Sequence, residues 1–196
     1  MVTGKRRHPI FAGPLFELFL LTGGVRSGQV NLGTVDILNY LNFGRVWRMG
    51  VLILQETVQW VDWDGKGLEH CVCRSDPDGI ELEGVVVGTR HGNYGGSYLV
   101  VTDAAFATRE VKVSYVGGAQ MHVTSDGKGN WFDCIAKREL PSLAGCFDVD
   151  IGITPATNML PIKRLKLAEG EAREISAAYV PLPSQIEGDF LPRSAP

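Results

Sequence analysis

Hydrophobic and polar residues alternate in short runs along most of the chain, with a period of two. In an extended strand this period places apolar side chains on one face and polar side chains on the other. The clearest runs are Arg109–Val116 and Ala119–Thr124, which are joined by Gly117-Gly118. Paired glycines between two alternating runs are typical of a tight hairpin turn. The pattern therefore predicts antiparallel strands connected by hairpins.

Further strands are predicted wherever the same alternation recurs between turn residues. They are Thr57–Trp63, Leu68–Arg74, Ile80–Thr89, Tyr98–Thr102, Asn130–Ile135 and Ala172–Val180. The turns lie 8 to 12 residues apart at most positions, and helical periodicity is scarce. We expect an all-β, mostly antiparallel fold of about ten strands, arranged as a sandwich, barrel or rolled sheet.

One further segment, Cys146–Ile153, alternates strictly and carries two carboxylates on one face. Asp148 and Asp150 would lie about 6.6 Å apart at their Cα atoms along a strand. Thr154-Pro155 then predicts the start of a short helix, since Thr is a good N-cap and Pro suits the first helical position. Pro161 is predicted to limit that helix to about a turn and a half, with Ile162–Leu167 returning as a strand.

Two motifs resemble those of a known family. They are Trp60–Cys71 (W-V-D-W-D-G-K-G-L-E-H-C) and Gly145–Leu167 (G-C-F-D-V-D-I-G-I-T-P-A-T-N-M-L-P-I-K-R-L-K-L). Together they resemble the bacterial putative glycolipid-binding family, over Val58–Val180. The resemblance implies a fold related to lipid and lipoprotein carriers, in which a strongly curved β-roll or half-barrel carries one short helical turn. It also implies a concave face that needs a covering element or a ligand.

The first 50 residues differ from the rest in charge. Residues 1–50 contain six basic and two acidic residues, and residues 51–196 contain 13 basic and 20 acidic ones. We predict an N-terminal extension over residues 1–50, with a non-native start, and one β-roll domain over residues 51–196. Two alternatives are a degenerate secretory signal around Lys5–Leu21 and an amphipathic segment at Val35–Phe43 that docks on the domain or on a membrane. No apolar run is long enough for a transmembrane helix.

The acidic character of the main domain argues against nucleic acid as a partner, because such binding depends on Lys and Arg that neutralise phosphates. The four cysteines are Cys71, Cys73, Cys134 and Cys146. We interpret them as free thiols of a cytoplasmic protein. Cys71 and Cys73 share one strand face, which suits two buried thiols better than a metal site, since their spacing is not that of a zinc knuckle. No metal or cofactor is predicted.

The paired carboxylates allow two interpretations. Asp148 and Asp150 have a separation that would suit the two acids of a glycosidase. Acids on the open face of a strand are also common, and structural, solvated or ligand-contacting roles are favoured over catalysis. Arg164 is expected within reach of either carboxylate, where it would brace the intervening loop.

Other residues in the two motifs also have a structural and a functional interpretation. Thr154, Thr157 and Asn158 suit a tight turn, and their polar groups would also meet sugar hydroxyls at a pocket mouth. His70 is interpreted first as a partly buried imidazole, since Glu69 should point to the opposite face. Trp60 is expected in the core or at the rim, where its ring would stack on a sugar. The predicted ligand-binding set is Trp60, His70, Asp148, Asp150, Thr154, Thr157, Asn158 and Arg164, and no catalytic residue is assigned.

The sequence therefore favours a non-enzymatic protein that binds an amphipathic molecule, a glycolipid or a similar lipid, in the concave face of a β-roll. Acyl chains would lie on Val, Leu and Trp side chains, with the polar residues at the mouth. One alternative is an enzyme that processes glycosides or esters through Asp148 or Asp150 with His70. The other is a protein-interaction domain that uses a sheet edge or the concave face.

Overall fold

A large antiparallel sheet of nine strands dominates the computed structural model, which describes residues 4–11, 35–48, 51–62 and 65–186. Each strand pairs with its neighbours in sequence, so the sheet is a meander in the order β10-β9-β8-β7-β6-β5-β4-β3-β2. The strands are β2 (Val35–Arg48), β3 (Val51–Asp62), β4 (Leu68–Asp76), β5 (Gly79–Gly88), β6 (Tyr94–Thr102), β7 (Thr108–Tyr115), β8 (Gln120–Ser125), β9 (Trp131–Asp133) and β10 (Arg138–Glu139). The hairpin predicted around Gly117-Gly118 is confirmed as β7 and β8.

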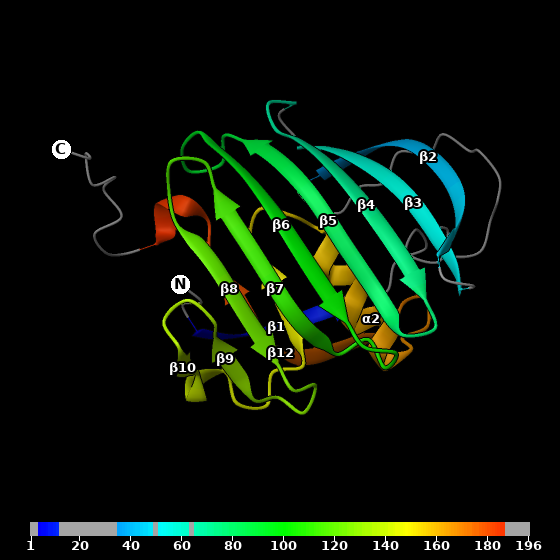
Figure 1. Ribbon diagram of the computed structural model, residues 1–196. Helices are drawn as coiled ribbons and strands as arrows, with labels where there is room; N and C mark the ends of the chain where they lie inside the picture. The colour runs from blue at the N-terminus through cyan, green and yellow to red at the C-terminus, as the bar shows by residue number, and fades with distance from the viewer. Residues whose placement is uncertain (1–3, 12–34, 49–50, 63–64, 187–196) are drawn as a thin grey trace.

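A second, three-stranded sheet has the order β1-β12-β11, with β1 at Gly4–Phe11, β12 at Ala172–Val180 and β11 at Asp148–Ile151. β1 runs antiparallel to β12, and β11 runs parallel to it. The helical segments are η1 (Pro141–Leu143), η2 (Ala156–Asn158), α2 (Met159–Leu165) and η3 (Pro183–Gln185). Figure 1 shows the large sheet arching over α2 and the small sheet.

The core lies between the concave face of the large sheet and the elements that cover it. Alternate residues of β4 to β8 are buried, as expected from their period of two. They belong to one cluster with Ile151 of β11, Leu160 of α2 and Val180 of β12. The fold is thus the expected all-β, mostly antiparallel curved sheet, but the chain's own side chains fill most of the concave side.

Two glycines on β5 allow tyrosine rings from β6 to lie across the concave face. The strand register pairs Gly84 with Tyr98 and Gly88 with Tyr94. A Cβ atom at Gly84 would lie 2.4 Å from the Tyr98 ring, and one at Gly88 would lie 2.4 Å from the Tyr94 ring. Such contacts are far too short, so a side chain at either position would displace the ring. Tyr98 is 3% exposed and therefore has little room to move.

The structure corrects the predicted strand at Ile162–Leu167. Its first four residues lie in α2, which directly continues η2. Pro161 is the third residue of α2, where a backbone N–H has no acceptor within the helix, so proline does not interrupt it. The helix ends at Lys166, which adopts a left-handed conformation with φ 52°. Within the described ranges, no helix is long and apolar enough to cross a membrane.

Parts of the predicted N-terminal extension belong to the two sheets. Gly4–Phe11 forms β1 against β12, and Val35–Arg48 forms the edge strand β2 against β3. Val35–Phe43, considered above as a docking segment, is therefore strand. Most of the proposed signal, from residue 12 onward, lies outside the described residues. The division of the chain at residue 50 stays a prediction.

The packing of Tyr98 against Gly84 yields a testable expectation. Gly84→Ala should lower the free energy of unfolding by about 1–3 kcal/mol, because the added methyl group overpacks a site where the buried ring cannot retreat. Gly88→Ala is the matched control on the same strand, and it should cost less because Tyr94 is only half-buried. Urea denaturation of both variants provides the comparison. Equal stability of Gly84→Ala and wild type would contradict this packing.

Candidate functional site

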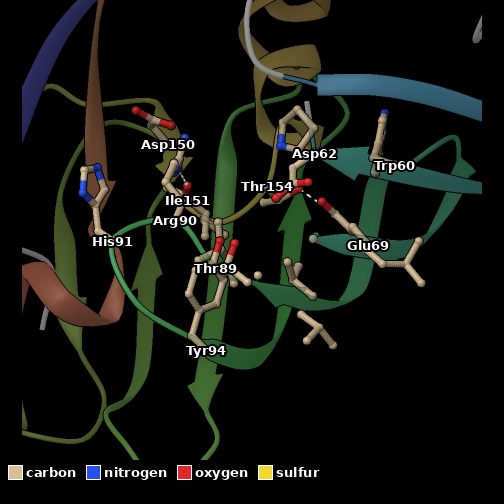
Figure 2. A pocket seen from close by; sticks show the side chains of 18 of the residues that line it. Trp60, Asp62, Glu69, Thr89, Arg90, His91, Tyr94, Asp150, Ile151 and Thr154 are labelled. Atoms are coloured by element: carbon tan, nitrogen blue, oxygen red, sulfur yellow. Dashed lines mark hydrogen bonds between the residues drawn. The ribbon is translucent and has the colours of Figure 1, made fainter. Parts of the chain in front are cut away.

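A cavity of about 680 Å³ opens at one end of the interior. It lies where β3 ends, β4 begins, β5 ends and β6 begins, and it is closed from the other side by the loop that follows β11 (Figure 2). The two sheets therefore both contribute to it. A volume of this size is within the range of small-molecule binding sites.

A buried carboxyl group, that of Glu69, lies at the floor of the cavity. Glu69 belongs to β4 and is 4% exposed. Its Oε1 atom accepts hydrogen bonds from Tyr98 Oη at 2.5 Å and from Thr154 Oγ1 at 2.6 Å. Figure 2 shows the Glu69 and Thr154 side chains directed toward each other. Among the described residues, Oε2 receives no hydrogen bond, so one oxygen is held and the other is available to a ligand.

Burial controls the protonation of this carboxyl group. Desolvation raises the pKa of Glu69 to about 7, and the hydrogen bonds from Thr154 and Tyr98 oppose that rise only partly. Desolvation and the neighbouring Glu69 also raise the pKa of Tyr98, so its phenol keeps the proton that it donates. A titratable group with a strongly shifted pKa in a cavity is a physical indication of a functional site.

The rim of the cavity contains charged side chains that are already engaged. Arg6 of β1 lies 3.5 Å from Asp150 and stacks 4.6 Å from the centre of the Tyr179 ring. Arg90, in the loop between β5 and β6, donates to the backbone carbonyl of Gly152. Asp62 Oδ1 accepts the backbone N–H of Lys66 at 2.7 Å. Of these contacts, the one between Arg90 and Gly152 joins the two sheets, whereas the others lie within one sheet or one turn.

The walls of the cavity combine aromatic and aliphatic surface. Trp60 is 7% exposed, and Tyr94 is half-buried. Val86 and Ile153 are buried within the cavity wall, and at the mouth the cross-strand pair Leu68 and Val87 is 53% and 58% exposed. Trp60, Tyr94, Val86 and Ile153 therefore give the cavity an apolar wall beside the buried carboxyl group of Glu69.

Four of the eight predicted ligand-binding residues line this cavity: Trp60, Asp150, Thr154 and Asn158. Thr154 has the structural role considered for it, because its hydroxyl accepts the Ala156 N–H at 2.9 Å, and it also donates to Glu69. Its contact with a ligand stays a prediction. Thr157 is 1% exposed, and its Oγ1 accepts the Ile151 N–H at 3.4 Å. Its position is structural.

Asp148 and Arg164 form the expected internal brace and do not line the cavity. Arg164 Nε lies 3.0 Å from Asp148 Oδ1, and Arg164 Nη2 lies 2.6 Å from Oδ2. The Asp148 side chain is 1% exposed, so it is no surface acid at the opening. Arg164 reaches it from helix α2, where a strand had been predicted. Of the paired acids, only Asp150 faces the cavity.

His70 is exposed on the outer face of β4, opposite to Glu69, and its interpretation as a partly buried imidazole is wrong. Its Nδ1 lies 3.5 Å from Gln59 Nε2. The enzyme alternative that combined His70 with Asp148 and Asp150 therefore has no common site. No group of three or more metal-ligating side chains occurs among the residues that the structure describes.

Sequence reasoning missed Glu69, Tyr98 and Arg90. A signal for Glu69 was present, because it lies two residues before Cys71 and therefore shares the face assigned to buried thiols. Cys71 and Cys73 are indeed buried, and desolvation raises the pKa of both thiols to about 12. No local pattern links Tyr98 to Glu69, which lies 29 residues earlier.

These features describe a curved-sheet domain with a cavity at one end. A family model described as putative glycolipid-binding matches residues 57–187, and the chain belongs to this family. A solved structure, a DUF1089 family protein from Pseudomonas aeruginosa, is 34% identical, with a TM-score of 0.47. The match covers 59% of this chain and 63% of that one, so this chain spans less than two thirds of its length. A comparison with curated proteins finds no match.

The raised pKa of Glu69 predicts a characteristic pH dependence of stability. The unfolded chain ionises Glu69 near pH 4.5, whereas the folded protein does so only near pH 7. Stability should therefore fall as pH rises between these values, by about 3 kcal/mol relative to Glu69→Gln. Urea denaturation at pH 4.5, 6 and 7.5 measures this difference. His70→Gln, on the outer face of the same strand, is the control, and parallel curves for wild type and Glu69→Gln would contradict the assignment.

The buried brace predicts a second stability effect. Arg164→Met should lower the free energy of unfolding by roughly 3 kcal/mol, because it leaves the buried Asp148 side chain without its partner. Adding Asp148→Asn should recover much of that loss. Arg6→Met is the control, and it should cost about 1 kcal/mol or less because the side chain of Arg6 is 54% exposed. A double variant no more stable than Arg164→Met would disprove the coupling.

Proposed function

We propose that this protein binds an amphipathic molecule of the glycolipid type without transforming it. The polar head occupies the end cavity against Glu69, and the alkyl chain leaves over Leu68 and Val87. The carrying observation is the Glu69 carboxyl group, which is fixed through Oε1 and open to the cavity through Oε2, between the aromatic walls of Trp60 and Tyr94. Membership of the putative glycolipid-binding family supports the same class of ligand.

The geometry suits a sugar for two reasons. Carboxyl oxygens accept hydrogen bonds from hydroxyl groups, and the floor and rim present Glu69, Asp62 and Asp150. Aromatic faces pack against the apolar side of a sugar ring, and Trp60 and Tyr94 provide such faces. A pocket with apolar walls and a few placed polar groups is the usual architecture of a small-molecule site.

The alkyl chain is assigned to the mouth because the concave interior is already filled. The buried cluster joins both sheets and α2, so side chains of the protein itself occupy much of the concave side. Leu68 and Val87 face each other across β4 and β5 and are largely exposed. They form the apolar surface adjoining the cavity, in place of the deep concave site expected from the sequence.

Two valines on β5 provide a matched test. Val85 and Val87 are both 58% exposed, but only Val87 lines the cavity. Val87→Asp should weaken the binding of dodecyl β-D-maltoside about tenfold, since it replaces an apolar contact worth about 1–2 kcal/mol by a charge. Val85→Asp should leave the affinity within about twofold of wild type. Isothermal titration calorimetry below the critical micelle concentration measures both.

A ligand search on the natural protein complements this titration. Protein purified without detergent is extracted with organic solvent, and the extract is analysed by mass spectrometry beside the intact complex. Co-purified glycolipid supports the proposal. Absence of any lipid, together with no binding of dodecyl β-D-maltoside, would refute it.

A further inference from the structure

The arginines of the cavity already have partners within the protein. Arg6 contacts Asp150 and the Tyr179 ring, and Arg90 donates to the Gly152 carbonyl. No lysine occurs among the described lining residues. A phosphate or sulfate headgroup would therefore share each arginine with a partner in the protein. Phosphate sites, in contrast, usually present Arg or Lys side chains directly to the ligand.

The carboxyl groups of the cavity also disfavour an anionic ligand. Glu69 lies at the floor, and Asp62 and Asp150 lie along the wall and rim, so an entering anion meets acids from three strands. Like charges in a partly desolvated site repel each other more strongly than in water. A hydroxyl group, in contrast, is attracted to these oxygens, because it donates a hydrogen bond to them.

On the basis of the proposed binding function, we infer that the cavity selects uncharged, hydroxyl-rich headgroups and excludes anionic ones, and that Glu69 is the residue that determines this choice. Glu69 holds that position because Tyr98 and Thr154 orient its Oε1 atom, which leaves Oε2 toward the ligand. Every hydroxyl-bearing headgroup can donate to Oε2, whereas a sulfate or phosphate oxygen cannot. The selection therefore follows from the direction of hydrogen bonding as well as from charge.

The exclusion of anions should strengthen with pH. The protonated acid can donate from Oε2 to an anionic oxygen, whereas the carboxylate repels it, and the pKa of Glu69 near 7 places this change in an accessible range. His91 also lines the cavity and would attract anions when protonated, so it requires its own control. The other ionisable groups around Glu69 are Asp62 on β3, Cys71 on β4, Arg90 in the loop between β5 and β6, Tyr94 and Tyr98 on β6, Asp150 on β11, Arg6 on β1 and Tyr179 on β12.

Two probes with the same alkyl chain test this inference: octyl β-D-glucoside and octyl sulfate, both used below their critical micelle concentrations. The charge of octyl sulfate is constant between pH 5.5 and 8, so any pH dependence arises from the protein. Calorimetric titration at pH 8 should show that wild type binds the glucoside at least tenfold more tightly than the sulfate. At pH 5.5 this ratio should fall several-fold.

Three variants separate the contributions. Glu69→Gln should bind octyl sulfate about tenfold more tightly than wild type at pH 8, and its glucoside-to-sulfate ratio should no longer change with pH. His70→Gln, on the outer face of β4, should behave as wild type. His91→Gln should retain the change in ratio between pH 5.5 and 8, which distinguishes Glu69 from the histidine.

The outcomes distinguish this inference from the proposed function. Equal binding of both probes by wild type at pH 8 would overturn the selectivity and leave amphipath binding intact. Failure of both probes to bind would count against both proposals. The role of Glu69 would be overturned by either of two results. The glucoside-to-sulfate affinity ratio of wild type would be independent of pH, or its pH dependence would be the same in Glu69→Gln. The pH series of His91→Gln, in which the histidine cannot contribute, provides this test even if Glu69→Gln does not fold.

Discussion

The hydrogen bonds that meet at Glu69 Oε1 connect the two sheets at the point where the cavity forms. Tyr98 comes from β6 and Thr154 from the loop after β11, and both donate to this one oxygen at the floor. The contact joins segments separated by 29 and 85 residues. Because a buried carboxyl group is costly without partners, these two hydroxyl groups are required for Glu69 to occupy this position at all. The site and the junction of the sheets are therefore the same piece of structure.

The arrangement also depends on the absence of a side chain at Gly84. The Tyr98 ring crosses β5 at this glycine and reaches β4, where its hydroxyl meets Glu69. Glycine within a strand usually weakens it, and a close approach of another group is a common reason for its presence. Here the approaching group is the Tyr98 ring, whose hydroxyl group orients Glu69. Gly84 is unfavourable in a strand, but it makes this contact possible.

Asp148 and Asp150 show how one strand face can serve two purposes. Asp148 lies beneath α2 and is neutralised by a bidentate contact with Arg164. Asp150, two residues on, lies at the edge of the cavity near Arg6. The alternation of the strand predicts that the two side chains share a face. Neighbouring elements cover Asp148 completely, whereas Asp150 is only partly buried. Burial separates the two acids into a structural brace and a rim residue.

The sequence by itself determined most strands, the β7–β8 hairpin and the importance of the two motifs, but it did not predict β1, β2 and β10. Period-two alternation and turn glycines act over a few residues, so they are readable without knowledge of the fold. The same local rules placed Thr154 at a turn and paired Arg164 with a neighbouring aspartate. They failed at Ile162–Leu167, because the segment after Pro155 forms η2 first and α2 starts only at Met159. Pro161 therefore lies in the first turn of α2, where proline is tolerated.

Only the tertiary structure decided which residues form the cavity. The strand pattern assigned Glu69 to an inner face, but it contained nothing about Tyr98 and Thr154 meeting it there. His70 and Arg164 belong to the two sequence motifs but lie outside the cavity. Membership of a motif does not show which face of the sheet a side chain is on or which cavity it lines. The cavity lies where the ends of β3 to β6 meet the small sheet and the loop after β11. That meeting is set by contacts between segments far apart in the chain, which no local pattern encodes.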